Sequence, residues 1–596
     1  MNKDKKWNIL PAPSEEFLNA FPELPPIVAR LLWNRNLREQ KQIDEFLNPD
    51  YSSDLHDPYL FRDMKTAVDI LFDAIQNNKR IIVHGDYDAD GVCAAALLVN
   101  TLKKLGHNNV GVFLPHRETD GYGLNSKTVN YLAEQKTDII ITCDCGISNT
   151  EEIKLAKQKG IKVIITDHHT IPPELPPADA IIHPLVTGET YPDKGLSGGG
   201  VAFKLMQGLL ARHHMNNELL PDGQTHEAFE KWQLDLASIS TVGDMVPLVG
   251  ESRTIVRYGL TVINKTRNLG LKYLLQIAGI NDENNNPKRG EITTETLSFQ
   301  VVPRINAAGR MDHANVAFEL LTATDEVEAK RLAEKLNKNN LDRQKLTEQI
   351  VNTARAQIRQ NSADTDPILF AYDPTWITGI LGLIAGKIKD EFNKPTIIMG
   401  KNSGEITGSG RSIPEFNMIG ALQKIPQFFH KFGGHPMACG FSLESEKKLD
   451  KFKSALKKLA LKDIADTTKL IPTINIDAEV NLEDIHWELY DILQKFEPFG
   501  QKNEEPKYVA SGLTIVSVDP VGQTGKHLRL MVKHNNHITR KTIGFGLGDT
   551  NKHPADWGKN LKASDKIDLV FTVGVNEWNG NRELQLKIID IRKSSK

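Results

Sequence analysis

Cysteine is scarce in this chain, which has four in 596 residues. Cys93, Cys143, Cys145 and Cys439 are too few and too far apart for a disulfide framework, which favours a reducing compartment. One residue separates Cys143 from Cys145, whereas zinc ribbons and thioredoxin-like sites use a spacing of two. We interpret these two cysteines as small buried residues at the end of a strand.

The chain also lacks long apolar runs. No stretch reaches the uninterrupted apolar length that a bilayer requires, and residues 1–17 contain no apolar signal core. Hydrophobic residues make up 40% of the chain and charged residues 25%, so neither wholesale disorder nor a membrane bundle fits. We therefore expect a cytoplasmic protein with no membrane partner.

A net charge excess is absent as well. The formal charge is −3, so the overall balance does not indicate a nucleic-acid partner. Residues 525–596 differ, because they hold 14 Lys and Arg residues against 7 Asp and Glu residues. The aromatic residues interleaved with them are Phe545, Trp557, Phe571 and Trp578. This pattern fits single-strand binding by stacking and charge, although a solvated basic face explains it equally well.

What the chain does contain is a dense acidic motif. Residues 81–90 read IIVHGDYDAD, so Asp86, Asp88 and Asp90 follow an apolar run that ends in His84. Carboxylates this close raise one another's pKa and repel one another unless a positive charge sits among them. A bound cation would remove the difficulty.

The motif opens an alternating pattern of apolar strands and amphipathic helices. Strands are predicted at residues 80–85, 110–115, 137–144, 162–169 and 178–184, and helices at 90–106, 125–135 and 149–160. This alternation predicts a buried parallel sheet with right-handed crossovers. Ligands of such sheets bind beyond the carboxyl ends of the strands.

Acids and imidazoles follow several of these strands. Asp144 ends one strand, Asp167, His168 and His169 end the next, and a buried helix within residues 234–248 would present Asp244. Each motif alone is explained as a helix cap, a strand end or a turn. Together, four elements on one rim would leave a costly cluster of negative charge without bound cations. Carboxylates mixed with imidazoles favour manganese over calcium, with zinc or magnesium as alternatives.

The order and spacing of these motifs resemble the DHH phosphoesterase superfamily. The matching motifs are H-x-x-x-D-x-D at residues 84–90, D-C-G at 144–146, D-H-H at 167–169, and Asp244. The ligands that the resemblance implies are His84 and Asp88 for one divalent ion, Asp90, His168 and Asp244 for a second, and Asp144 as a bridge. Manganese is the expected ion at both positions, with magnesium as the alternative.

The same resemblance implies catalytic roles for three residues. His169 would face the scissile phosphate, Asp167 would brace the imidazoles, and Asp144 would act between the two ions. The role of Asp86 stays open. Two neighbouring divalent ions activate a water molecule and stabilise the attacking and leaving oxygens, so the expected reaction is phosphodiester hydrolysis.

The whole chain is predicted to divide into five parts. These are an N-terminal helical segment (1–79), the catalytic domain (80–265), a helical connector (266–362), a smaller α/β lobe (363–464) and a nucleic-acid-binding barrel (465–596). The lobe resembles the DHH-associated domain, and the short strands of the last part fit an oligonucleotide-binding (OB) fold. The predicted fold class is thus a two-lobed α/β protein, with a parallel-sheet catalytic domain joined by a long helix to the smaller lobe, and a C-terminal OB-fold barrel.

This order resembles the branch of the superfamily that degrades single-stranded DNA. The resemblance implies 5′-to-3′ release of mononucleotides during recombination and repair, from a strand threaded between the two lobes. Single-stranded DNA is the implied partner, a single-strand-binding protein or a helicase is a further candidate, and a monomer is expected.

Six residues are candidate contacts for the DNA. Arg304 and Arg310 flank a small-residue turn, and pairing with local acids explains them equally well. Arg117, Ser409 and Arg411 are implied by the resemblance to hold the 5′-terminal phosphate. His435 lies in a nearby glycine-rich stretch that could bind a phosphate or carboxylate. Backbone amides at the glycine-rich residues 196–205 could cradle a phosphate, although the Walker lysine spacing is missing.

Two alternatives remain open. A DHH hydrolase of small phosphates or short oligonucleotides would keep the same metals but would not need the barrel. A catalytically inactive replication scaffold would keep the architecture but would have no reason to retain all six metal ligands.

Overall fold

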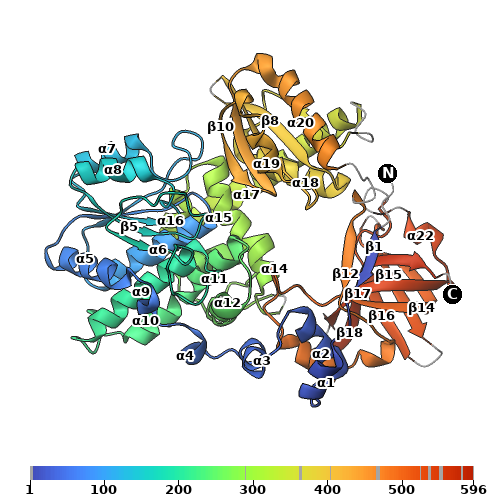
Figure 1. Ribbon diagram of the computed structural model, residues 1–596. Helices are drawn as coiled ribbons and strands as arrows, with labels where there is room; N and C mark the ends of the chain where they lie inside the picture. Colours follow the sequence, from blue (N-terminus) through green and yellow to red (C-terminus); the bar gives the residue numbers. More distant parts are fainter. Residues whose placement is uncertain are drawn as a thin grey trace. The chain divides into compact units, whose positions relative to one another are not determined.

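The computed structural model describes residues 5–288, 290–360, 366–402, 404–464, 470–523, 525–534, 538–549, 553, 555–578 and 581–594. The chain forms two compact units (Figure 1). One comprises Asn48–Leu346 and Pro498–Asn503, and the other comprises Met1–Leu47, Thr347–Glu497 and Glu504–Lys596. The predicted boundaries at 362/363 and 464/465 fall in or beside residues 361–365 and 465–469, which lie outside the described residues. The five-part division therefore stays a prediction.

The first of these units is built on a five-stranded parallel sheet. Its strands are β2 (Ile81–His84), β3 (Val110–Phe113), β4 (Ile139–Cys143), β5 (Lys162–Thr166) and β6 (Ala180–Ile182). Their spatial order is β3-β2-β4-β5-β6, and every neighbouring pair is parallel, as predicted. The chain order reverses between β2 and β4, which is where ligands bind in open sheets of this kind.

Helices cover both faces of this sheet because strand residues alternate between two apolar cores. Ile81 and Val83 belong to the core of α6 (Ala89–Lys104), whereas Ile82 belongs to the core of α7 (Ser126–Glu134) and α8 (Thr150–Gln158). Figure 1 shows α7 and α8 on one side of the sheet, opposite α5 (Met64–Gln76), α6 and α9 (Gly198–His214). The sheet is thus buried on both faces, which explains its nearly continuous apolar strands.

Further helices complete this unit. They are α4 (Tyr51–Asp54), α10 (His226–Trp232), α11 (Leu234–Gly243), α12 (Gly250–Ile263), α13 (Leu269–Ile277), α14 (Thr294–Thr296), a π-helical turn η2 (Leu297–Val301), α15 (Val302–Met311) and α16 (Asn315–Leu321). α17 (Glu326–Gln360) is one uninterrupted helix, as predicted for the connector, and continues into the other unit. The predicted turn between Arg304 and Arg310 is wrong, because both residues lie inside α15. The proline of α15 lies in the first turn of the helix, where its missing N–H loses no intrahelical hydrogen bond, and the alanines of α15 favour helix.

The other unit contains the smaller α/β domain. Its sheet has the order β10-β11-β9-β8-β7, with β7 (Leu369–Tyr372), β8 (Thr396–Asn402), β9 (Glu405–Arg411), β10 (Phe429–His435) and β11 (Ala438–Leu443). Only β7 and β8 pair in parallel, and the remaining pairs are antiparallel. The accompanying helices are α18 (Leu381–Phe392), α19 (Met418–Gln423) and α20 (Leu449–Asp463).

The same unit ends in the predicted barrel. Its strands are β14 (Tyr508–Val521), β15 (His527–His534), β16 (Ile538–Gly544), β17 (Lys566–Trp578) and β18 (Asn581–Lys593). The sheet order β14-β15-β16-β18-β17 closes through pairing of β14 with β17. β13 (Ala478–Glu479) extends it beside β14, and α21 (Trp487–Gln494) and α22 (Trp557–Asn560) accompany it. Phe571 is buried in the barrel and Phe545 is exposed, while the side chain of Trp578 lies outside those described.

The N-terminal segment adds a strand to its helices. Besides α1 (Glu15–Ala20), α2 (Pro26–Asn34) and α3 (Gln40–Leu47), it forms β1 (Lys6–Ile9), which pairs in parallel with β12 (Thr473–Ile476). The indole of Trp7 donates a hydrogen bond to Asp590 at 2.7 Å, and the Arg592 guanidinium lies 4.0 Å from the ring centroid. Among the described residues, no helix is long and apolar enough to cross a bilayer.

Candidate metal centre

The loop from β2 to α6 places the acidic motif at the carboxyl edge of the sheet. Asp88 caps α6, because its Oδ1 accepts hydrogen bonds from the backbone N–H groups of Asp90 at 3.0 Å and Gly91 at 3.3 Å. Asp86 lies against Gly91, where an added Cβ would come within 2.4 Å of the Asp86 nitrogen. The loop is therefore folded tightly enough that only glycine fits at position 91.

Asp144 follows β4 in a left-handed backbone conformation, with φ of 61°. Its carboxylate lies beside Gly198 of α9, where a Cβ would come within 2.5 Å of the Asp144 Cβ. Asp144 is 2% exposed, and its Oδ1 is buried without a hydrogen-bond partner. A buried carboxylate oxygen without a donor is costly unless a cation binds it.

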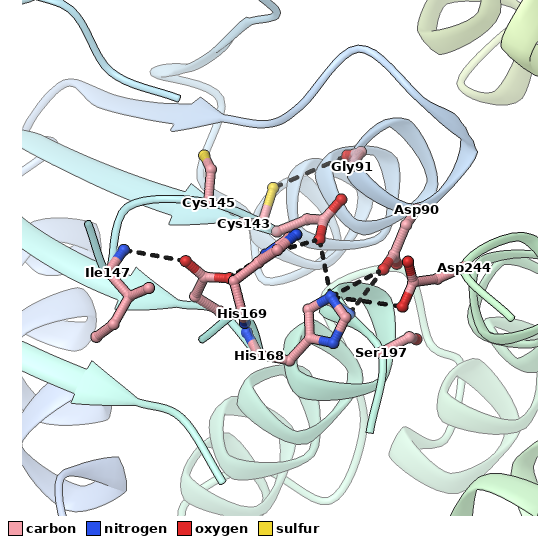
Figure 2. Close-up of polar contacts among 12 residues, drawn as sticks. Asp90, Gly91, Cys143, Cys145, Ile147, His168, His169, Ser197 and Asp244 are labelled. Atoms are coloured by element: carbon pink, nitrogen blue, oxygen red, sulfur yellow. Dashed lines mark hydrogen bonds and ion pairs between the residues drawn. The ribbon is translucent and has the colours of Figure 1, made fainter. Parts of the chain in front are cut away.

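His168 is the point where three carboxylates converge (Figure 2). Its Nε2 lies 3.2 Å from Asp144 Oδ1, 3.5 Å from Asp244 Oδ2 and 3.7 Å from Asp90 Oδ2. Asp244 is presented by the C-terminal end of α11, as predicted. The structure therefore brings together side chains from the ends of β4 and β5, the first turn of α6 and the end of α11.

Three groups of side chains have the spacing of metal ligands, each with its ligand atoms within 4.8 Å of one another. The groups are Asp90, His168 and Asp244; Asp86, Asp88 and Asp144; and Asp144, His168 and His169. Asp144 and His168 each belong to two of them, and Asp144 is the member that links the group of Asp86 and Asp88 to the histidines, which fits a bridging position. Asp86 joins Asp88 and Asp144, so the residue whose role stayed open lies inside the cluster.

His84 is not a member of these three groups, but it is fully buried at the end of β2. Its ring stacks on Phe113, and its Nε2 has no hydrogen-bond partner. Burial lowers the pKa of His84 to about 4, so the imidazole is neutral and keeps a lone pair for a cation.

Asp90 is held by the N-terminus of α9. The backbone N–H groups of Gly198 and Gly199 donate to its two carboxylate oxygens at 2.9 and 2.7 Å, and the Ser240 hydroxyl donates to Oδ1. The prediction that these glycine amides cradle a phosphate is wrong, because the Asp90 carboxylate already occupies them. A helix N-terminus stabilises a carboxylate in the same way as a phosphate.

Asp167 braces the two histidines from the end of β5. Its Oδ1 accepts hydrogen bonds from the backbone N–H groups of His168 at 2.7 Å and His169 at 3.1 Å, and lies 2.8 Å from His169 Nδ1. Its Oδ2 accepts from the Ile147 amide at 3.0 Å. Burial opposes ionisation, but the contact with His169 prevails and lowers the pKa of Asp167 to about 2. Because this carboxylate is ionised, the Nδ1 of His169 is the donor.

The electrostatics of the cluster favour bound cations. Burial, followed by the charges of Asp90 and Asp88, raises the pKa of Asp144 well above its ordinary value. The same causes raise the pKa of Asp244 to about 8. Divalent ions would relieve this repulsion, and the oxygen and imidazole donors suit manganese or magnesium. The residues present therefore fit a divalent metal centre.

Comparisons with known proteins agree with this geometry. Family models match residues 80–231 (DHH family, N-terminal domain), 365–462 (DHHA1 domain) and 476–590 (RecJ OB domain). The single-stranded-DNA-specific exonuclease RecJ of Bacillus subtilis (strain 168) is 34% identical over 594 residues, covering 98% of this chain and 70% of that protein. The protein of the same name from Escherichia coli (strain K12) is 32% identical, covering 96% of each chain. The chain belongs to the RecJ family.

Solved RecJ structures extend the likeness to three dimensions. The crystal structure of RecJ in complex with Mn2+ from Thermus thermophilus has a TM-score of 0.80 at 26% identity, covering all of this chain and 81% of that one. The complex of RecJ with Mg2+ from the same organism has a TM-score of 0.75 at 25% identity, covering 99% and 79%. RecJ relatives thus bind the two ions that the donor set of this chain suits.

Two of the predicted DNA contacts of this RecJ-family chain lie around Tyr87 of the acidic loop. The Arg117 guanidinium lies 3.8 Å from the Tyr87 ring centroid, and its Nε donates to the Gly309 carbonyl at 3.3 Å. Burial raises the pKa of the Tyr87 hydroxyl, and the charges of Arg117 and Arg310 act against this rise. Arg304 lies elsewhere on α15, where it donates to Asn337 of α17 at 3.0 Å and to the Gln300 carbonyl.

The other three predicted contacts share one face of the sheet in the smaller α/β domain. In the strand register, Arg411 of β9 lies opposite Ala438 of β11, which lies opposite His435 of β10. Ser409 precedes Arg411 by two residues and so lies on the same face of β9. Arg411 donates to the Ser409 hydroxyl at 3.1 Å. Gly433 and Gly440 continue the row of Ser409, and neither would meet another atom if a Cβ were added. The backbone beside Ser409 is therefore open to a ligand.

The sequence analysis did not identify three residues near the metal centre. Ser240 lies one helical turn before Asp244, His183 follows β6 and donates to the His169 carbonyl at 2.9 Å, and the Tyr122 hydroxyl donates to the Asp144 carbonyl at 3.0 Å. The Tyr122 hydroxyl also lies 3.0 Å from His169 Nδ1. The strand-end rule that found Asp144 applies equally to His183. Nothing local in the sequence marks Tyr122.

Proposed function

We propose that the chain is a 5′-to-3′ exonuclease that hydrolyses single-stranded DNA to mononucleotides in recombination and repair. The observation that carries this proposal is the convergence of Asp90, Asp144 and Asp244 on His168 in a chain of the RecJ family. The relatives from Bacillus subtilis and Escherichia coli are named single-stranded-DNA-specific exonucleases. The 5′-to-3′ polarity of hydrolysis and the role in recombination and repair are part of this proposal.

Two divalent ions are part of the proposal, with manganese preferred. One would be held by Asp90, His168 and Asp244, and the other by His84, Asp86 and Asp88, with Asp144 between them. When bound, such a pair of ions supplies Lewis-acid activation of the phosphodiester and stabilises both the attacking and the leaving oxygen.

The side chains around the ions would orient the substrate. Asp167 accepts the Nδ1 hydrogen of His169. Burial opposes protonation of the ring, but this hydrogen bond prevails and raises the pKa of His169 to about 9, so the protonated ring would donate its Nε2 hydrogen to an oxygen of the scissile phosphate. Arg117 and Arg310 would bind phosphates beside Tyr87, and Ser409 and Arg411 would hold the 5′-terminal phosphate, with His435 beside them. The α9 amides keep Asp90 in one rotamer, so the acidic groups need little rearrangement before the reaction.

The test is hydrolysis of 5′-labelled single-stranded DNA in the presence of Mn2+. We expect early release of labelled mononucleotide by the wild type, and loss of this release in Asp144→Ala. Asp235→Asn is the matched control, because Asp235 is also buried but hydrogen-bonds Thr266, away from the centre. Label that stays in strands shortened from the other end would refute the polarity, and an active Asp144→Ala variant would refute the site.

A further inference from the structure

A pocket lies in the same compact unit as the metal centre, at the other end of two helices that carry metal ligands. Its volume is about 670 Å³, which is within the range of pockets that bind small molecules. α6 presents Asp90 in its first turn, and Asn100 and Lys104 line the pocket toward the other end of this helix. α11 ends at Asp244 and begins after Gln233, which also lines the pocket.

The pocket is distinct from the metal centre. The helical rise from Asp90 to Lys104 along α6 is roughly 20 Å, so one small ligand does not reach both sites. We call this cavity the Trp232 pocket. The lining residues that bear on its ligand are Lys104, Phe229, Trp232, Gln233, Arg267 and Leu321.

Two cations stand at the rim of the Trp232 pocket. The exposed guanidinium of Arg267 lies 4.1 Å from the Trp232 ring centroid, and it forms no ion pair within the part of the chain that the structure describes. Stacking holds this planar group in place while its N–H edge stays available to a phosphate. Lys104 lies 5.4 Å from the Phe229 ring centroid, and its ion-pair partner Asp222 is half exposed. A phosphate can therefore replace that carboxylate at low cost.

The interior of the pocket offers an apolar wall and one unsatisfied amide. Phe229 and Leu321 are buried and Trp232 is half-buried, which suits a flat ring. Gln233 Oε1 is shielded from solvent and has no hydrogen-bond partner among the residues described. Turning this amide toward a ligand would give the oxygen a donor without breaking a hydrogen bond of that oxygen. A glutamine amide pairs with adenine through N6 and N7 of the base.

Asp235 also lines the pocket, but it is not one of the proposed contacts. It is 3% exposed, and its carboxylate already accepts hydrogen bonds from the Leu236 N–H at 2.7 Å and from the Thr266 hydroxyl at 2.9 Å. Because Asp235 is buried whereas Arg267 is exposed, an anionic group is expected at the rim and an uncharged ring in the interior.

We infer that the Trp232 pocket binds an adenine nucleoside monophosphate. The phosphate contacts Arg267 and Lys104, and the adenine lies against the apolar wall and pairs with the Gln233 amide. An apolar wall with a few polar groups that fix orientation is the usual composition of a small-molecule site. The inference uses no residue of the metal centre and does not depend on hydrolysis of DNA.

The test is titration of the full chain with dAMP in EDTA, with the tryptophans replaced by 5-fluorotryptophan and followed by fluorine NMR. The resonance of Trp232 is identified by its loss in Trp232→Phe. We expect dAMP to move this resonance in a saturable way. Inorganic phosphate and deoxyadenosine should each bind roughly tenfold more weakly or less, because each lacks one half of the contacts.

Two substitutions remove one half of the contacts each. Arg267→Gln should weaken dAMP binding roughly tenfold, and Gln233→Ala should weaken it by about the same factor. The matched control is Lys265→Gln, because Lys265 is an exposed cation close to Arg267 in the chain but does not line the pocket. Arg411→Gln should leave the response of Trp232 unchanged, since the proposed contact for the 5′-terminal phosphate belongs to the other compact unit.

The outcomes separate the pocket from the proposed function. If dAMP leaves the Trp232 resonance unmoved, or if Arg267→Gln and Gln233→Ala bind dAMP as tightly as the wild type, the pocket proposal is wrong. Equal weakening by Lys265→Gln would show unspecific charge attraction, and equally tight binding of inorganic phosphate would exclude the adenine contact, so either result overturns it. A wild type that binds dAMP in the pocket but hydrolyses no single-stranded DNA in Mn2+ refutes only the proposed function.

Discussion

Asp90 shows how much of the metal centre depends on residues that touch no substrate. Both of its oxygens already accept hydrogen bonds, from Gly198, Gly199 and Ser240, before a cation is considered. Such partners fix a carboxylate in one orientation, and they act against the rise in its pKa that burial causes. The affinity of the centre for metal therefore depends on Ser240 as well as on the ligands.

Replacing Ser240 with alanine should weaken metal binding. We expect the Mn2+ affinity to fall roughly 10- to 100-fold, as is typical when a hydrogen-bond partner of a metal ligand is removed. Isothermal titration with Mn2+ measures the affinity directly, independently of activity. Ser252→Ala is the control, because Ser252 is equally buried but donates to the Gly195 carbonyl. An unchanged Mn2+ affinity in Ser240→Ala would contradict the positioning role.

Asp235 is a buried acid outside the centre, and it should make the stability of its unit depend on pH. Burial raises its pKa from 3.8 to about 6, against the opposing hydrogen bond from Thr266. Because the folded state holds the proton more tightly than the unfolded state, stability falls as pH rises from about 4 to about 6. Above pH 6, ionised Asp235 lowers the free energy of unfolding by at most about 3 kcal/mol, since each unit of the pKa shift corresponds to roughly 1.4 kcal/mol.

The Asp235→Asn variant removes this titration. Its amide oxygen can still accept from the Leu236 N–H, and its NH2 group can donate to Thr266. At pH 7.5 we expect the melting temperature of the variant to equal or exceed that of the wild type. As pH falls to 4, the melting temperature of the wild type should rise relative to that of the variant. Calorimetric melting temperatures measured over this range provide the check. A difference that stays constant with pH would show that Asp235 does not titrate there.

At the scale of elements, the N-terminus of α9 is the piece that fits most tightly against the centre. Gly198 leaves no room for a side chain, since a Cβ would lie 2.5 Å from the Asp144 Cβ. At Gly200, two residues on, a Cβ would meet the Leu196 side chain at 3.4 Å, an ordinary contact. The two glycines begin one helix but meet different surroundings.

This contrast predicts opposite outcomes for two alanine substitutions. Gly198→Ala should displace Asp144 and reduce hydrolysis of single-stranded DNA at least 100-fold, together with Mn2+ affinity. Gly200→Ala should keep near wild-type activity and a similar melting temperature, since alanine also favours helix. Hydrolysis rates and Mn2+ titration of the two variants decide the matter. Similar losses of activity and Mn2+ affinity in both variants would mean that the glycines are needed to form helix α9 and not to make room for Asp144.

The elements also show what a sequence can reveal and what it cannot. Periodicity located every strand of the parallel sheet, and the strand-end rule located Asp144 and His168, because both signals lie within a few residues. The hydrogen bond from Ser240 to Asp90 joins residues 150 apart, so no local pattern announces it. β1 was not predicted for the same reason. Its four residues have no strong strand pattern of their own, and their backbone hydrogen bonds are made with β12, far along the chain.

At the scale of the whole molecule, the metal ligands and the barrel belong to different compact units. All proposed ligands lie within Asn48–Leu346, whereas the smaller α/β domain and the barrel belong to the other unit. A ligand that binds only the folded form of one unit stabilises that unit by mass action. Units with separate cores can also unfold in separate steps.

Calorimetry of the full chain should therefore resolve two unfolding transitions, only one of which responds to Mn2+. At a free Mn2+ concentration 100 times the dissociation constant, the stabilisation is about 2.7 kcal/mol, which raises the melting temperature of the unit that holds the ligands by roughly 4 °C. EDTA should reverse the shift, and Asp144→Ala should abolish it without moving the other transition. A Mn2+ shift of equal size in both transitions, or one that persists in Asp144→Ala, would place the bound ion outside the cluster around His168, because an ion bound in that cluster would stabilise one unit and would need Asp144.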